Sequence, residues 1–419
     1  MRSARGVLTT RGLTLLAGGT ALWIVARLLG VAELHIVAAA SLALVGAGGL
    51  SVVLAAPAIS VRRTVTPRLA YGARGEVVVD LRNDGRPHST LLLVEDACPP
   101  DLRAAGTRFV ISELGTGRAV SLRYPIVAGA RGRHTVGPLR ILVRDPFGLA
   151  QRTRRDAGTD QVLVYPPIEA LPPDAIRARH YGDGSSPHRQ PFEDGDEFHT
   201  MREYVEGDDL RRVHWPSTAR RQRLMVRQQE QTRQARAFIF LDIRRCAHEG
   251  RGPHSTAEKA IGVAASLVSH LTAHGFQLCL ATEADRRGNP ARQSPARMLE
   301  HLAELAPSSV PGLGPALQQM ADAQGLLIAV VRPTPPAAGG GSTESADARA
   351  LLRAGRGRPG RIALVIASGP GDQRADALAG MLRGAGWRAT TIAPGETLAS
   401  RWACLDTGPH RTATAGMAP

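Results

Sequence analysis

The first sixty residues contain two long apolar segments. Leu13–Val31 has one charged residue, Arg27, and Ile36–Ile59 has none. At 1.5 Å per residue in a helix, each segment is long enough to cross a hydrocarbon core of about 30 Å. Because only four residues separate the segments, we predict a transmembrane helical hairpin over residues 1–59. A signal peptide is the main alternative for the first segment.

Residues 60–170 instead alternate apolar and polar positions over short segments, with Gly, Pro, Asn and Asp between them. The clearest segments are Glu76–Leu81, Thr90–Val94, Arg118–Tyr124 and Leu139–Val143. A period near two is typical of half-buried strands. About seven such strands in about 100 residues predict an antiparallel, immunoglobulin-like β-sandwich.

A turn with the sequence Asp145-Pro146-Phe147-Gly148-Leu149 follows the last of these strands. We expect Phe147 to close one end of the sandwich. Gly148 is expected to adopt a positive φ, which glycine does without steric cost. Both expectations are structural, because the sandwich contains no clustered acid, base or nucleophile.

Residues 235–400 alternate buried-strand segments with segments of helical spacing. The strand segments are Ala237–Asp242, Phe276–Ala281, Leu326–Val331 and Arg361–Ala367, and the helical segments are Thr256–His274, Pro295–Leu305 and Arg374–Gly386. This alternation predicts a doubly wound, mostly parallel sheet, in which ligands bind at the carboxyl ends of the strands. We expect residues 333–346 to form a loop insertion and residues 401–419 a flexible tail. The whole chain is then an α+β multidomain protein.

The chain is strongly basic, with a formal charge of +15, and 51 of its 52 basic residues are arginine. Nucleic-acid binding, attraction to an anionic membrane surface, and a solvated surface of paired arginines and acids could each explain this charge. Aromatic residues make up only 4% and no nucleic-acid-binding motif is present, so no nucleic-acid partner is expected. The four cysteines lack the spacing of a disulfide framework or a zinc site.

Arginines flank both apolar segments, and their positions predict the orientation of the hairpin. By the positive-inside rule both ends of the hairpin are cytoplasmic. We therefore expect a multi-pass protein of the cell membrane with two spans, whose termini and soluble domains are cytoplasmic. The flanking arginines are Arg2, Arg5, Arg11, Arg62, Arg63 and Arg68.

Acids and arginines alternate densely in the central segment, residues 171–234. The residues that stand out are Glu197, Arg202, Glu203, Tyr204, Asp208, Asp209, Arg211, Arg212, His214, Trp215 and Arg220. Their pattern resembles the signature of the bacterial domain-of-unknown-function family 58 (DUF58), and the Asp145–Leu149 turn and the apolar segments fit the layout of that family. The resemblance implies a von Willebrand factor A-like domain over residues 235–400 and a MoxR-type AAA+ ATPase as partner.

The physical interpretation of this segment is a structural clamp or a partner-docking surface. Asp208 or Asp209 can cap a short helix that begins at Leu210, because a carboxylate accepts the free amides there. The arginines are placed to pair with the neighbouring carboxylates through bidentate forks. Trp215 is expected to end this turn and to bury its indole.

The resemblance also implies a metal position, because von Willebrand factor A-like domains bind a divalent cation through an Asp-x-Ser-x-Ser loop after a strand. Asp242 matches the first position, but Arg244 and Cys246 replace the two serines, and Arg332 follows a later strand where an Asp would be expected. Mg²⁺ requires an oxygen shell. We therefore expect a degenerate site without metal or cofactor, in which Asp242 pairs with Arg244 or Arg332.

Two classes of function remain open. The first is a non-enzymatic, membrane-anchored interaction or scaffold protein that docks a MoxR-type AAA+ ATPase in the assembly or maturation of an envelope-associated complex. The second is an enzyme with His214 as general base, oriented by Glu203 or Asp209. Binding of nucleic acid or of an anionic membrane surface is a lesser alternative. The common nucleotide, zinc-protease and serine-hydrolase motifs are missing from the sequence, which favours the first class.

Overall fold

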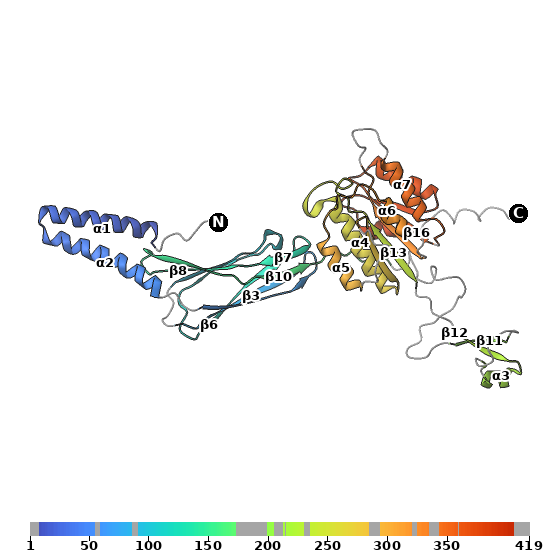
Figure 1. Ribbon diagram of the computed structural model, residues 1–419, viewed down its shortest axis with the longest axis horizontal. Helices are drawn as coiled ribbons and strands as arrows, with labels where there is room; N and C mark the ends of the chain where they lie inside the picture. The colour runs from blue at the N-terminus through green and yellow to red at the C-terminus, as the bar shows by residue number, and fades with distance from the viewer. Residues whose placement is uncertain are drawn as a thin grey trace, which may run out of the picture. The chain divides into compact units, whose positions relative to one another are not determined.

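The computed structural model describes residues 8–54, 59–85, 91–172, 199–204, 213, 215–229, 235–284, 294–320, 325–334, 343–358 and 360–405. The chain divides into two compact units. The first comprises Met1–Glu169, Glu249–Ser266 and Ala296–Pro307, and the second comprises Ala170–His248, Leu267–Pro295 and Ser308–Pro419. Figure 1 shows the elements in chain order by colour.

The first unit begins with two apolar helices, α1 (Thr10–Leu29) and α2 (Ala32–Leu54), which lie side by side. Gly30 ends α1 in the left-handed conformation, with φ of 68°, as glycine does at helix C-termini. Both helices are long and apolar enough to span a membrane. The two apolar helices predicted from the sequence are therefore confirmed, although the connection between them is shorter than the predicted four residues.

Among the described residues that follow, ten strands form three sheets, which we call the β-domain. The strands are β1 (Ile59–Val65), β2 (Arg68–Leu69), β3 (Arg74–Asn83), β4 (Leu92–Asp96), β5 (Arg108–Ile111), β6 (Ala119–Val127), β7 (Gly132–Val136), β8 (Leu139–Arg144), β9 (Gln151–Asp156) and β10 (Asp160–Val164), with a 3₁₀ turn η1 (Pro100–Leu102). The sheet orders are β1-β3-β6, β5-β4-β8-β9 and β2-β10-β7. All neighbours are antiparallel except β2 and β10, which are parallel.

One apolar core joins the three sheets of the β-domain. Alternate residues of β3 and β8, such as Val79 and Ile141, are almost fully buried in it, and their neighbours along each strand are more exposed. This period of two is the pattern from which the strands were predicted. The predicted antiparallel sheets are therefore present.

The turn at Asp145–Leu149 differs in part from its prediction. Gly148 has the expected positive φ, 70°. Phe147, however, is 60% exposed, so the expectation that it closes the domain is wrong. The inner position is taken by Asp145, which is 2% exposed and accepts hydrogen bonds from the amides of Phe147 (3.0 Å) and Ala150. The turn therefore points Leu149 inward and Phe147 outward.

Arg131 links the β-domain to the two later segments of the first unit. Its guanidinium donates to the carbonyl oxygens of Ala303 and Leu305, each at 2.9 Å, at the end of α5 (Pro295–Glu304). It also forms an ion pair with Glu258 at 2.8 Å, in the first turn of α4 (Thr256–Ala273). A cation at a helix C-terminus satisfies carbonyls that have no partner within the helix.

The second unit contains a five-stranded parallel sheet with the order β14-β13-β15-β16-β17. The strands are β13 (Arg236–Leu241), β14 (Gln277–Thr282), β15 (Leu326–Val331), β16 (Gly360–Ile366) and β17 (Arg388–Ile392), and all four pairs are parallel. Helices α6 (Gly314–Gln319), α7 (Thr343–Ala354) and α8 (Gln373–Gly384) share an apolar core with one sheet face. The predicted parallel sheet is confirmed, and its von Willebrand factor A-like character stays a prediction.

Two elements lie where the sequence predicts irregular structure. Helix α7 begins at Thr343, inside the predicted loop 333–346, and buries Leu351. Helix α9 (Leu398–Cys404) extends into the predicted tail and buries Trp402 completely. In both cases the helix is held by burial of apolar side chains against neighbouring elements, which overrides the Gly-, Pro- and Ser-rich sequence beside it.

Four further elements complete the described chain. Strands β11 (His199–Glu203) and β12 (Met225–Gln229) form an antiparallel pair, and the helix α3 (Trp215–Arg221) lies between them in sequence. A 3₁₀ turn, η4 (Gly252–His254), precedes α4. The central segment predicted from the sequence thus supplies a small hairpin with one short helix.

His270 on α4 gives the second unit a predicted pH dependence. Burial and the nearby His274 lower the pKa of His270 to about 4, and the edge of its ring packs on Trp402 at a centroid distance of 5.8 Å. Because the unfolded chain binds this proton near pH 6.5 and the folded chain does not, we expect stability to fall by up to about 3 kcal/mol as the pH drops from about 6.5 to about 4. Unfolding midpoints measured between pH 4 and pH 7.5 test this. His270→Phe should flatten the curve, whereas His301→Phe, at an exposed position, should leave it unchanged.

Candidate functional site

The direction of the strand order reverses between β13 and β15, which are neighbours in the sheet although β14 lies between them in sequence. Crevices for ligands form outside the carboxyl ends of parallel strands at such a switch point. Asp242 directly follows β13 and Arg332 directly follows β15. Both are nearly fully buried, at 0% and 4% exposed. This edge is therefore the candidate functional site of the second unit.

Asp242 and Arg244 form a closed, fully buried ion pair at this edge. Arg244 donates from Nε to Asp242 Oδ1 and from Nη2 to Oδ2, each at 2.9 Å, and its backbone amide donates to Oδ1 at 3.1 Å. Both side chains are 0% exposed. The pairing of Asp242 with Arg244, one of the two partners predicted, is thus confirmed. Burial would lower the pKa of Arg244, but its bonds to Asp242 outweigh this and raise the pKa.

A second carboxylate, Asp347 of α7, completes the coordination of the Arg244 guanidinium. Arg244 Nη1 donates to Asp347 Oδ2 at 2.7 Å. The Leu313 amide and the Thr334 hydroxyl also donate to Asp347, at 3.1 and 3.2 Å. Asp347 was missed from the sequence because it lies just after a Gly- and Ser-rich run. The feature of the sequence that could have located Asp347 on a helix is the helical spacing of the apolar residues that follow it in α7.

Glu283 lies on the other side of Asp242, just after β14. Its carboxyl group accepts from the Ile243 amide at 3.0 Å and from the Ser308 hydroxyl. Burial raises the pKa of Glu283 above its usual value. His248 Nε2 donates to the Asp242 carbonyl oxygen at 2.7 Å, because a carbonyl oxygen can only accept. Burial lowers the pKa of His248, so we assign the neutral ring with its proton on Nε2.

Arg332, the other arginine of the edge, bonds to neutral groups. Its guanidinium donates to the Ala247 carbonyl oxygen and to the Ser368 hydroxyl. A cavity beside Arg332, Thr334 and Asp347 has a volume of about 10 Å³, which is room for about one water molecule. The crevice of the switch point is thus filled by the protein's own side chains.

These residues do not fit a divalent cation. The guanidinium of Arg244 occupies the space between the carboxylates of Asp242 and Asp347 and bonds to both. A metal ion would have to displace this buried cation to reach its oxygen ligands. Cys246, the third residue predicted for this site, is exposed. The buried cation Arg244 neutralises the charges of Asp242 and Asp347 within the protein.

The central segment brings together a different set of residues from the one predicted. Glu203 at the end of β11 pairs with Arg223 at 2.9 Å, with both side chains more than half exposed. Trp215 begins α3 and is 69% exposed, so the prediction that it ends a turn and buries its indole is wrong. The inward positions are filled by Val213 and Met225, at 8% and 1% exposed.

The remaining residues predicted for this segment are placed as follows. Tyr204 follows β11, and its amide donates to the Leu224 carbonyl oxygen at 2.8 Å. Arg220 is exposed on α3, and Arg202 lies within β11. The others lie outside the described residues: Glu197, Asp208, Asp209, Arg211, Arg212 and His214. The helix predicted to begin at Leu210 and the His214 active site fall there too.

A protein-family match concerns the central part of the chain. Residues 200–331, from β11 to β15, match the family described as "Protein of unknown function DUF58". The uncharacterized protein YeaD of Bacillus subtilis is 26% identical over 249 residues, which are 56% of this chain and 59% of that protein. The chain thus spans less than two thirds of the length of this relative.

Solved structures that resemble this chain do so over about a quarter of its length. A CARDB domain from Pyrococcus furiosus, solved in complex with di-metal ions, is 15% identical and is matched over 26% of this chain and 88% of its own, with a TM-score of 0.19. Native alpha-2-macroglobulin from Escherichia coli is 17% identical over 29% of this chain and 21% of its own, with a TM-score of 0.23. The family match covers residues 200–331, which include part of the signature in the central segment, so this part of the chain is similar to DUF58 proteins.

Proposed function

We propose that this chain is a non-enzymatic, membrane-anchored interaction protein that docks a MoxR-type AAA+ ATPase during the assembly or maturation of an envelope-associated complex. The observation that carries the proposal is the exposed Trp215 in the family-matched segment. The ATPase enters through the resemblance to DUF58 proteins. In this proposal the hairpin α1–α2 is the anchor, and arginines on both sides of it keep the other domains in the cytoplasm.

Trp215 has the properties of an interface anchor. A side chain of this size that is 69% exposed offers a large apolar area at a low cost in conformational entropy. Arg220 and Arg221 are exposed on the same short helix, and Leu224 is 39% exposed just beyond it. Tryptophan and arginine are the residues most enriched among those that dominate binding energy at protein interfaces.

The switch-point edge supports a binding role over a catalytic one. A general base needs a lone pair that can reach a substrate. Asp242 bonds to Arg244 through both carboxylate oxygens, and Glu283 bonds to Ile243 and Ser308. The guanidinium in place of a metal also makes docking by this domain independent of divalent cations.

Trp215→Ala is expected to weaken the binding of the ATPase about 30-fold, because truncating a central tryptophan at an interface costs about 2 kcal/mol or more. The full chain in detergent micelles is immobilised, and binding of the purified MoxR-type ATPase from the same organism is measured by interferometry with and without EDTA. Tyr71→Ala is the matched control, since Tyr71 is an exposed aromatic residue of the β-domain. Equal affinity of wild type and Trp215→Ala would remove α3 from the interface.

A further inference from the structure

We propose that the membrane-proximal end of the β-domain binds an anionic phospholipid. The headgroup lies on a basic collar formed by Arg11, Arg144 and Arg152, and an acyl chain lies in the apolar groove between α1 and α2. The inference rests on the proposed role of the hairpin as a membrane anchor. It gives the Asp145–Leu149 turn, which the proposed function does not use, a role at the membrane surface.

Hydrogen bonds fix the Asp145–Leu149 turn to the start of α1. The Thr9 amide donates to the Leu149 carbonyl oxygen at 2.8 Å, and the Thr9 hydroxyl donates to the Gly148 carbonyl oxygen at 2.7 Å. Gly12 packs so closely on Leu149 that a Cβ there would overlap its carbonyl oxygen. The turn also lies close to α2, because a Cβ at Gly48 would be 3.2 Å from Asp145 Oδ2.

The length of α1 places this junction at the surface of the bilayer. Helix α1 has 20 residues between Thr10 and Leu29, and at 1.5 Å per residue it spans about 30 Å, the thickness of the hydrocarbon core. With the Gly30–Val31 connection at one surface, Thr9 and its partner Leu149 lie at the other. The turn is therefore at the depth of the lipid headgroups.

Three arginines near this junction are exposed to solvent. Arg11 is in the first turn of α1, Arg144 is the last residue of β8, and Arg152 is the second residue of β9, and all three are exposed. Arg144 Nη2 donates to the neutral side chain of Gln151 at 3.3 Å. The carboxylate of Asp145 is turned inward, where backbone amides bind it. Arg144 is paired with Gln151 and Arg152 with Val143, so the two arginines lie on opposite faces of the β8–β9 pair. Guanidinium groups bind phosphate through paired hydrogen bonds, so the collar offers a phosphodiester headgroup a guanidinium on either face of this strand pair.

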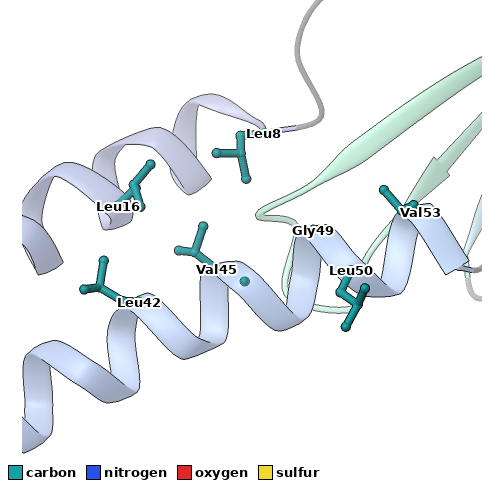
Figure 2. A pocket seen from close by; sticks show the side chains of 8 residues that line it. Leu8, Leu16, Leu42, Val45, Gly49, Leu50 and Val53 are labelled. Atoms are coloured by element: carbon teal, nitrogen blue, oxygen red, sulfur yellow. The ribbon is translucent and has the colours of Figure 1, made fainter.

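Apolar features beside the collar match the rest of the lipid. Phe147, 60% exposed at the tip of the turn, is suited to the boundary between headgroups and acyl chains. The groove between the helices has a volume of about 470 Å³ and is lined by Leu8, Leu16, Leu42, Val45, Gly46, Gly49, Leu50 and Val53. Figure 2 shows Leu42 and Val45 of α2 pointing toward α1, on which Leu16 lies, with Leu8 just before the start of α1. A single ligand with an anionic head and a hydrocarbon tail satisfies both surfaces.

The test uses the full chain in a mild detergent, mixed with equal amounts of phosphatidylglycerol and phosphatidylcholine. Native mass spectrometry counts the retained lipids. We expect the wild type to retain phosphatidylglycerol at least about fivefold over phosphatidylcholine, and Arg144→Gln/Arg152→Gln to bring this ratio close to one. The control Arg74→Gln/Arg123→Gln removes the same charge from exposed positions in another sheet of the β-domain and should keep the ratio.

Each outcome decides the proposal. A wild-type ratio near one, or a ratio unchanged in Arg144→Gln/Arg152→Gln, overturns it. Circular dichroism shows whether the variants are folded, and slower amide exchange of residues 144–156 in phosphatidylglycerol nanodiscs than in phosphatidylcholine nanodiscs supports the proposal without any substitution. Carbonate extraction distinguishes the membrane anchor of the proposed function from the lipid-binding collar proposed here. Release of the wild-type chain from membranes contradicts the anchor itself, whereas retention without lipid preference contradicts the collar alone.

Discussion

Replacing Arg244 with alanine is expected to lower the unfolding free energy of the second unit by about 3–5 kcal/mol. The side chains of Asp242 and Arg244 are both 0% exposed. Without the guanidinium, the Asp242 carboxylate loses both of its side-chain hydrogen bonds and faces Asp347 across an empty space. An unpaired charge that is buried in this way costs far more than the loss of a solvated one.

Urea denaturation followed by tryptophan fluorescence measures this effect. Trp387 and Trp402 are buried in the second unit, at 3% and 0% exposed, whereas Trp215 is exposed before unfolding. Arg245→Ala is the matched control, because Arg245 is the next residue along the chain and is exposed. It should change the unfolding free energy by less than about 0.5 kcal/mol.

A paired substitution separates the effect of an orphaned charge from that of lost packing. Asp242→Asn combined with Arg244→Met removes both charges and keeps most of the side-chain volume. We expect this double variant to recover most of the stability lost in Arg244→Ala, since replacing a buried ion pair by uncharged groups is often close to neutral. If the double variant is as unstable as Arg244→Ala, packing around the guanidinium and not charge compensation determines the stability of this edge.

The switch point illustrates what the sequence can predict. Asp242 and Arg244 are two residues apart at the end of a strongly apolar strand, so their contact is local and could be predicted. Asp347 contacts the same guanidinium from 103 residues away. Its position depends on α7, whose apolar residues pack on the sheet face. The Gly- and Ser-rich residues before α7 make its start hard to predict from the sequence. Long-range contacts of this kind are set by packing, and no local pattern encodes them.

The two aromatic residues that were wrongly expected to be buried have a common explanation. Phe147 and Trp215 each have an apolar neighbour two residues away in the chain, and the sequence alone does not decide which of the two side chains faces the core. In the structure a smaller neighbour is buried in each case, Leu149 beside Phe147 and Val213 beside Trp215. Hydrophobicity alone favours the larger side chain, but the backbone direction of the turn decides which one points to the core. Both exposed aromatics belong to surfaces for which we propose partners.

Arg63 shows the opposite error, because the sequence assigns it to the charges that orient the hairpin. In the structure its side chain is 2% exposed and forms an ion pair with Asp96, 1% exposed, at 2.8 Å. Tyr124 donates to the same carboxylate at 2.7 Å, and burial together with Asp96 raises the pKa of Tyr124. Arg63 also pairs with Asp160 at 3.2 Å. One arginine on β1 thus connects strands of all three sheets of the β-domain.

Asp96→Ala is therefore expected to destabilise the β-domain by about 3–5 kcal/mol. The substitution leaves the buried Arg63 with only the half-exposed Asp160 as a carboxylate partner, and it removes the acceptor of the Tyr124 hydroxyl. Amide hydrogen exchange measures the opening free energies of β1, β3 and β4 separately from those of the second unit. Faster exchange should be confined to the β-domain.

An exposed ion pair of the same chemistry provides the control for this prediction. Arg82 and Asp84 pair at 2.9 Å, but their side chains are 63% and 46% exposed. Asp84→Ala should therefore cost no more than about 1 kcal/mol, because water solvates the arginine that remains. Comparing Asp96→Ala with Asp84→Ala shows whether the loss of stability comes from burial of the ion pair or from ion pairing as such. If Asp96→Ala and Asp84→Ala have equal effects on exchange, the network of Arg63 does not hold the three sheets together, and the apolar core alone does.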